Sequence, residues 1–202
     1  MRSWVAPHTV RFYESGATCP DPVSGDVIIV DHNTFIAKGI SFSEGLLTLQ
    51  DKTLKGYTWC DHVAFIRQTG DGELLYLQDQ KRYAHYGEFV VSEMAFHGHQ
   101  YRSLDAYQTR IYAVVHFDVS DEARTAVLDA DRRCARVHYG FLQYAPLVVD
   151  CLSGAKWAGS YGDTMICSTE VALCATNLYW FFNLQPSGVM PCHVAQLVGA
   201  SH

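Results

Sequence analysis

The sequence predicts an α+β protein in which an antiparallel β-sheet of about five to six strands is flanked by helices. Short apolar segments with a two-residue alternation fill the middle of the chain, and a helical period replaces that alternation after residue 120. The length of 202 residues suits one domain with a sizeable core, and no repeat or linker divides residues 1–202.

The expected strands lie at residues 25–30, 56–67, 73–80, 88–96 and 109–119, where β-branched and aromatic residues are frequent. The turn signal QTGDGE predicts a hairpin between the second and third of these strands. Residues 1–24 contain three prolines and a glycine, which predict an irregular N-terminal extension. Residues 31–55 read as a long polar connection, and residues 96–102 as an exposed loop.

The expected helices lie in the second half of the chain. Residues 120–139 form an amphipathic pattern that opens with Ser120 as a cap and closes with arginines, as the helix dipole favours. Residues 162–182 predict a loop that turns into a long and mostly apolar helix. A short helix is expected at the end of the chain, over the segment CHVAQLV.

The bulk properties exclude several classes of function. A net charge of -6 gives no basic footprint, so nucleic acid is not expected as the main partner. No apolar run is long enough for a membrane span, and the N-terminus lacks the apolar region of a signal peptide, so synthesis in the cytoplasm is expected. Seven scattered cysteines without a CxxC pair argue against a disulfide framework and favour a reducing compartment.

Cys167 is the candidate nucleophile. With Asp163 or Thr164 as the helix cap, its thiol falls in the first turn, where the partial positive charge of a helix N-terminus favours a thiolate. The alternative is a buried structural cysteine, which is a common fate of this residue type.

His62 is the candidate general base among ten histidines, because it lies inside the expected strand WCDHVAFI, which would hold the ring rigidly. Gln78 is a polar residue within the apolar run of the next expected strand, where it would lie beside His62 and orient the imidazole. Glu73 or Asp79 would take that role in a different register. The alternatives are a core histidine and a glutamine that faces water.

Other residues could form a site in place of Cys167 and His62. The run Cys60-Asp61-His62 together with His85, His97 or His99 could ligate a metal, but no second cluster has ligand spacing, so neither a metal nor a cofactor is expected. Cys60 is a rival nucleophile without a helix N-terminus. Trp59 and Trp157 are candidates to line a cleft, although core positions suit tryptophans equally well.

The order of these parts resembles that of the circularly permuted NlpC-type papain-like cysteine hydrolases, and of the YiiX-like proteins among them. The resemblance rests on GDVII, DHVAFI, LYLQD, an amphipathic helix ending at Tyr139, CSTEVALC and MPCHVAQL, over residues 25–197. In that family the histidine strand precedes the cysteine helix. The cysteine opens a CSE-like motif, which here has one more residue before the acid. The family often has Glu as its third residue, and Gln78 departs from that.

The resemblance implies a permuted papain-like fold and a thiol hydrolase with Cys167 as nucleophile and His62 as base. Backbone N–H groups at the helix start would hold the oxyanion, with Tyr139 as a further donor. The implied substrates are amide bonds of peptidoglycan peptides in cell-wall fragments, which the chain would meet after release or on a particle. Two alternatives stay open: a hydrolase or acyltransferase for acyl amides or esters, and a non-enzymatic part of a phage-tail or surface assembly with a degenerate site.

Overall fold

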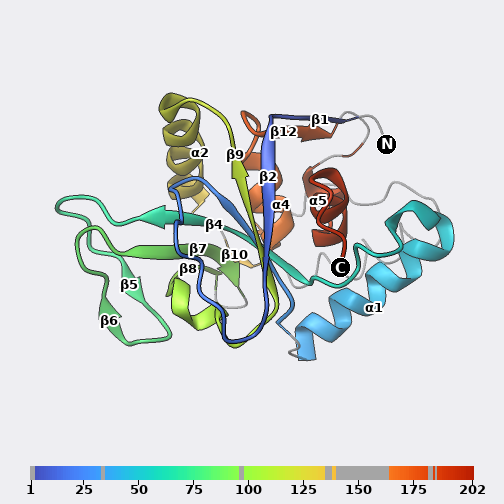
Figure 1. The fold of residues 1–202 in the computed structure, drawn as a ribbon, viewed down its shortest axis with the longest axis horizontal. Helices are drawn as coiled ribbons and strands as arrows, with labels where there is room; N and C mark the ends of the chain where they lie inside the picture. Colours follow the sequence, from blue (N-terminus) through green and yellow to red (C-terminus); the bar gives the residue numbers. More distant parts are fainter. Residues whose placement is uncertain are drawn as a thin grey trace.

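An eight-stranded mixed sheet forms the centre of the computed structural model, which is an α+β fold (Figure 1). The structure describes residues 3–32, 35–95, 98–134, 138–139, 164–181, 184 and 186–202. In sheet order the strands are β2 (His8–Tyr13), β9 (Tyr112–Phe117), β3 (Val27–Val30), β4 (His62–Gln68), β7 (Phe89–Ala95), β8 (Gly98–Ser103), β5 (Tyr76–Leu77) and β6 (Arg82–Tyr83). The neighbours are antiparallel, except that β5 runs parallel to β8.

Two short ribbons accompany the main sheet. β1 (Ser3–Val5) pairs antiparallel with β12 (Tyr179–Phe181), and β10 (His138–Tyr139) pairs parallel with β11 (Thr164–Met165). The helices of the described residues are α1 (Phe35–Gln50), α2 (Asp121–Cys134), α4 (Cys167–Cys174) and α5 (Pro191–Leu197), with short 3₁₀ turns η1 (Lys52–Leu54), η2 (Leu104–Tyr107) and η4 (Pro186–Gly188). None of these helices combines the length and the apolar character that crossing a bilayer requires.

The hydrophobic core has two layers because the central strands are buried on both faces. Along β4, Val63 and Phe65 belong to the layer shared with α2, α4 and α5, whereas Ala64 and Ile66 belong to the opposite layer with Tyr107 of η2. Alternate side chains of a strand point to opposite faces, so a fully buried strand reads as one continuous apolar run. In Figure 1, α2, α4 and α5 gather along one side of the sheet, and α1 projects beyond its end.

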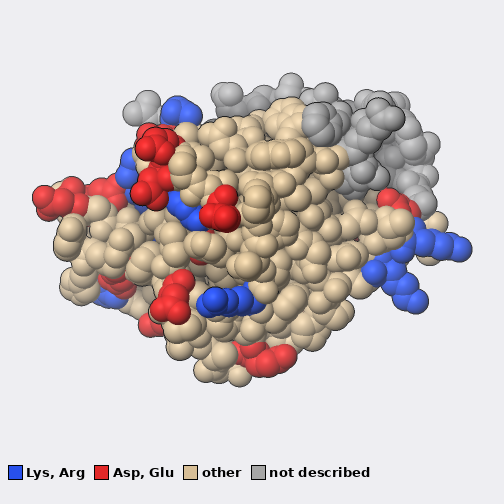
Figure 2. Space-filling view, turned by 45° about the horizontal axis from the view of Figure 1, so that its top comes forward, with Lys and Arg blue, Asp and Glu red and all other residues tan. Residues whose placement is uncertain are grey.

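Charge is distributed without a dominant sign on the face shown in Figure 2. Acidic and basic side chains are interspersed on the left and lower parts of the view, a mainly basic group stands at the right edge, and the broad area between them carries neither. This pattern agrees with the modest net charge of -6.

Several sequence predictions are confirmed: the α+β class, the strands near residues 25–30, 88–96 and 109–119, and the two amphipathic or terminal helices. Others are wrong. Residues 1–24 are not an irregular extension, because they contribute β1 and the sheet strand β2. The polar connection at residues 31–55 contains the 16-residue helix α1. The expected loop at residues 96–102 contains β8, within the residues that are described.

Two errors bear on the site. The expected hairpin is absent: β4 pairs with β3 and β7, while β5 lies beyond β7 and β8 at the far side of the sheet. The long apolar helix is also shorter than expected, because α4 ends at Cys174 and residues 179–181 form β12. Aromatic residues in the segment LYWFF favour a strand when a partner such as β1 is available.

A buried ion pair joins the sheet to α2. Nη1 of Arg124 lies 3.0 Å from Oδ1 of Asp26, and the guanidinium also donates to the carbonyls of Ser24 and Phe117. His116 approaches the same Asp26 oxygen at 3.1 Å. Burial raises the pKa of Asp26, and its two basic neighbours act against that rise.

Arg124→Met is therefore expected to lower the free energy of unfolding by about 3 kcal/mol, because it removes the guanidinium from a buried acid and leaves His116 as the remaining basic neighbour. Urea denaturation measures the change. The control is Asp129→Asn, which removes an exposed pair with Arg132 and is expected to cost no more than about 0.5 kcal/mol. Equal effects of the two substitutions would contradict this assignment.

Candidate active site

Cys167 is the first residue of α4, as a helix-borne nucleophile requires. The N-cap is Ile166, which makes no side-chain capping bond, and Thr164 lies in β11 instead of capping the helix. Asp163 falls outside the described residues. The thiol is fully buried in the layer between α4 and the sheet. It thus sits among the free N–H groups of a helix start without competition from a capping side chain.

His62 is the first residue of β4 and pairs in register with Val30 of β3. Its imidazole lies next to the thiol of Cys167, whose charge and side-chain hydrogen bonding act to raise the pKa of His62. The structure therefore brings together the two residues that the sequence singled out as nucleophile and base, although 105 positions separate them in the chain (167 − 62).

Glu93 of β7 is the second partner of the ring. Its Oε2 lies 2.7 Å from Nε2 of His62 in an ion-pair contact. The carboxylate is buried and held from two further directions, because the Tyr107 hydroxyl donates to Oε2 at 2.5 Å and the Gln100 amide donates to Oε1 at 2.6 Å. A nucleophile, a base and a group that orients the base thus follow one another in space.

The ionisable groups around His62 shift one another's pKa values. Burial alone would lower the pKa of His62, but the negative charges of Cys167 and Glu93 outweigh it and raise that pKa well above the ordinary value. Burial likewise acts to raise the pKa of Glu93, yet His62 and the Tyr107 hydrogen bond bring it well below the usual range. The geometry therefore favours an imidazolium paired with the carboxylate of Glu93.

His32 and Asp61 form a second layer around the imidazole. The backbone N–H of His32 donates to both Asp61 carboxylate oxygens at 3.0 Å, and the Nδ1 of His32 lies 3.3 Å from Oδ1. The His32 ring meets the His62 ring edge-on, with centroids 4.6 Å apart. Burial lowers the pKa of His32, which leaves this neighbour of the imidazolium neutral.

Gln78 does not lie beside His62. It is exposed just after β5, where its backbone N–H donates to the carbonyl of Tyr101, and β7 and β8 separate it from β4. The two alternatives to Gln78 are engaged elsewhere: Glu73 accepts from Arg67 at 2.6 Å, and Asp79 accepts from the Ser103 hydroxyl at 2.5 Å. The position expected for Gln78 is held by Glu93.

Sequence reasoning passed over Glu93 although a signal was present. EFVVSEMAF places one acid inside an otherwise apolar strand, which is the same pattern that drew attention to Gln78. His32 lies two residues after the end of the expected strand at residues 25–30, and it carried a similar, weaker signal.

The remaining candidates stand apart from the thiol–imidazole contact. Trp59 donates from its indole to the carbonyl of Ala200 at 2.7 Å and packs on Phe12. Tyr139 pairs in register with Met165 of β11, so its backbone lies beside the segment that enters α4, but its side chain is outside what the structure describes. Trp157 is also outside the described residues.

Cys60, the rival nucleophile of the sequence analysis, has a different setting from Cys167. It precedes β4, is fully buried, and directs its thiol to the carbonyl of Tyr57 at 3.6 Å. Burial, together with the nearby acid Glu44, raises its pKa well above the ordinary value.

A metal ion between His32, His62 and Glu93 is disfavoured, although their ligand atoms lie within 4.8 Å of one another. Nε2 of His62 and Oε2 of Glu93 are 2.7 Å apart, in direct ion-pair contact. Two ligands of one ion, each about 2.0–2.2 Å from it, lie farther apart than that at tetrahedral angles.

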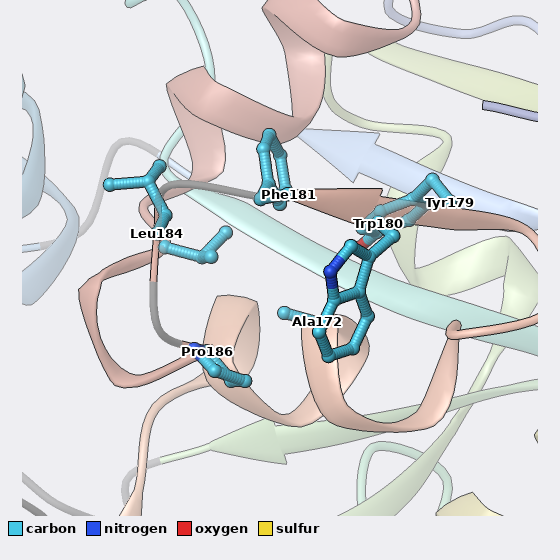
Figure 3. Close-up of a pocket in the computed structure, with 7 residues that line it drawn as sticks. Ala172, Tyr179, Trp180, Phe181, Leu184 and Pro186 are labelled. Atoms are coloured by element: carbon cyan, nitrogen blue, oxygen red, sulfur yellow. The ribbon is translucent and has the colours of Figure 1, made fainter. Parts of the chain in front are cut away.

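An apolar pocket lies against the other end of α4 (Figure 3). It is lined by Ala172, Tyr179, Trp180, Phe181, Leu184, Pro186 and Val189. The lining contains no carboxylate, imidazole or thiol, so it is not the reaction centre.

No protein-family model matches the chain, and no curated protein matches it significantly. The assignment of the site therefore depends on its geometry.

The contact with His62 predicts a selective reactivity. At pH 7, iodoacetamide is expected to label Cys167 at least about tenfold faster than Cys60, since only Cys167 is paired with an imidazole. Peptide mass spectrometry after short labelling times measures both rates. Cys60 is the matched control because both thiols are fully buried.

His62→Gln is expected to remove the difference between the two rates. If Cys167 in the unaltered protein reacts no faster than Cys60, the thiol–imidazole pair is not an activated one.

Proposed function

We propose that this chain is a thiol hydrolase in which Cys167 is the nucleophile, His62 the general base and Glu93 the residue that orients and charges the base. The proposal rests on two contacts of the His62 imidazole: one with the thiol of Cys167 and one with the buried carboxylate of Glu93, 2.7 Å away. The resemblance to permuted NlpC-type hydrolases, with the histidine strand ahead of the cysteine helix, is consistent with this order of parts.

The reaction would proceed in two stages. His62 accepts the thiol proton, and the sulfur of Cys167 attacks the substrate carbonyl to give a tetrahedral oxyanion near the N–H groups at the start of α4. Collapse breaks the C–N bond, and the amine leaves with the proton from His62. Water then attacks the thioester, His62 takes its proton, and the acid product and the free thiol are released. An amine or alcohol in place of that water would make the same site an acyltransferase.

Glu93 supports the enzyme reading over a degenerate site. The sequence placed a neutral amide, that of Gln78, in the orienting position, which would stabilise an imidazolium only weakly. A buried carboxylate stabilises it more, and a Tyr107 hydrogen bond at 2.5 Å fixes that carboxylate in place. We therefore propose amide bonds as the substrate, with peptidoglycan peptides as the first class, since that class follows from the resemblance.

Purified protein is expected to release amines from cell-wall fragments, and Cys167→Ser or His62→Gln is expected to lower kcat/KM by about 10³-fold or more. Fluorogenic acyl amides and esters form the second arm, so that turnover in that arm alone would assign the acyl class. Absence of turnover in both arms, together with unselective thiol labelling, would favour the non-enzymatic role.

Glu93→Gln separates orientation from structure through its pH profile. The negative charge of Glu93 helps to raise the pKa of His62, so its removal lowers that pKa. A rate that requires the imidazolium falls as the pH rises through the pKa of His62. The alkaline limb of kcat/KM, which should lie well above the ordinary value of 6.5, therefore moves to lower pH, and the maximum falls by about 100-fold.

Gln78→Ala is the control for this measurement, because Gln78 is exposed and separated from β4 by two strands. Its profile is expected to match that of the unaltered protein. A shifted limb in Gln78→Ala and an unmoved one in Glu93→Gln would return the orienting role to Gln78.

A further inference from the structure

A second group of polar side chains is buried where the sheet meets α2 and α4. It consists of His99 of β8, Asp131 of α2 and Glu170 of α4, whose side chains are 2%, 0% and 0% exposed. One ligand atom from each, the imidazole nitrogen or a carboxylate oxygen, lies within 4.8 Å of the other two. Glu170 is three residues after Cys167 on the same helix, but the thiol of Cys167 is not a member of this group.

The carboxylate oxygens of this group are short of partners. Oδ1 of Asp131 and both oxygens of Glu170 are buried without a hydrogen-bond partner among the described residues. Oδ2 of Asp131 accepts from the Ser92 hydroxyl at 2.6 Å, and that hydroxyl in turn lies 3.0 Å from Nε2 of His99. Buried acceptors in native proteins are nearly always satisfied, so three unsatisfied oxygens in one place indicate a missing partner.

The spacing of the ligand atoms fits a cation better than a shared proton. Nε2 of His99 lies 3.5 Å from Oδ1 of Asp131 and 3.7 Å from Oε1 of Glu170. Both distances are too long for a hydrogen bond of normal strength. Ligands about 2.0–2.2 Å from one ion at tetrahedral angles stand about 3.3–3.6 Å apart, which is close to these values.

Charge balance leads to the same conclusion. Two ionised carboxylates and a neutral imidazole carry two negative charges, which one divalent cation neutralises without exposing any group to water. One imidazole nitrogen with two carboxylate oxygens is a set that suits Zn²⁺ and its first-row neighbours better than Ca²⁺ or Mg²⁺, which prefer oxygen alone.

We propose that His99, Asp131 and Glu170 bind a divalent transition-metal ion, with Zn²⁺ as the preferred one, in a buried site with three protein ligands. The ion replaces the proton on Nε2, and Ser92 continues to hold Asp131 through its hydrogen bond. Because the three ligands come from β8, α2 and α4, the ion ties the helix that carries Cys167 to the sheet and to α2. None of the three ligands belongs to the group of Cys167, His62 and Glu93, so the site is distinct from the proposed reaction centre.

The test is metal binding by the full chain. Protein stripped with a chelator is expected to bind one equivalent of Zn²⁺, measured by elemental analysis after gel filtration, and to gain thermal stability when the ion returns. Co²⁺ in its place is expected to give visible d–d absorption. Asp131→Asn, Glu170→Gln and His99→Gln should each weaken Zn²⁺ binding by at least about 100-fold, more than the loss of an outer hydrogen bond.

Two controls keep the outcome specific. Glu44→Gln alters another buried acid, which lies outside the group: its Oε1 accepts from the backbone N–H of Cys192 at 2.8 Å, and its Oε2 has no hydrogen-bond partner among the described residues. This substitution is expected to leave the stoichiometry of Zn²⁺ binding unchanged. Cys134→Ser breaks the thiol pair with Cys174, whose sulfurs are 3.6 Å apart on the same two helices, and it should retain the ion.

The proposal is overturned if the unaltered protein binds no Zn²⁺, or binds it equally well after Asp131→Asn and Glu170→Gln. In that case Glu170 is held as a neutral acid, in line with the raised pKa that burial and Asp131 give it. If the variants fail to fold, the unaltered protein still decides the question. A melting temperature that does not rise when Zn²⁺ is returned would refute the site. His62→Gln is expected to bind Zn²⁺ with unaltered affinity, so the test of the metal site is independent of the test of the proposed hydrolase.

Discussion

The buried carboxylate of Glu93 is the group on which the arrangement around Cys167 depends. An ionised acid within a sheet is tolerated only if other groups compensate its charge. Here His62 supplies a cation at 2.7 Å, and Tyr107 and Gln100 supply hydrogen bonds. These contacts hold Glu93 against the imidazole of His62. The pairing of β4 with β7 therefore determines the orientation of the imidazole. Both strands are buried on two faces, which makes that position rigid.

The sequence predicted the proposed nucleophile and base better than the group that supports them. Cys167 and His62 each had a local pattern, a helix start and a strand, and these patterns survive in the fold. The third group depended on which strand pairs with β4, and a turn signal does not settle that. QTGDGE does turn the chain, but Glu73 folds back onto Arg67 and Gly70, and the following segment leaves for the far edge of the sheet.

The same limit explains the other differences. Alternating apolar residues predicted strands at β3, β7 and β9, but not their order, since pairing between distant segments leaves no local trace. The segment LYWFF continued an apolar run that read as helix, and its fate was decided by β1, at the other end of the chain. Glycines 39 and 45 suggested a loop, yet they lie inside α1, where packing of Ile40 and Leu47 outweighs their low propensity.

The pairing of β1 with β12 joins residues 3–5 to residues 179–181. β1 is therefore synthesised long before its partner β12, and contacts of such sequence separation are slow to form. His62 and Glu93 likewise precede Cys167 by many residues, so the proposed thiol–imidazole pair is assembled only after α4 has left the ribosome.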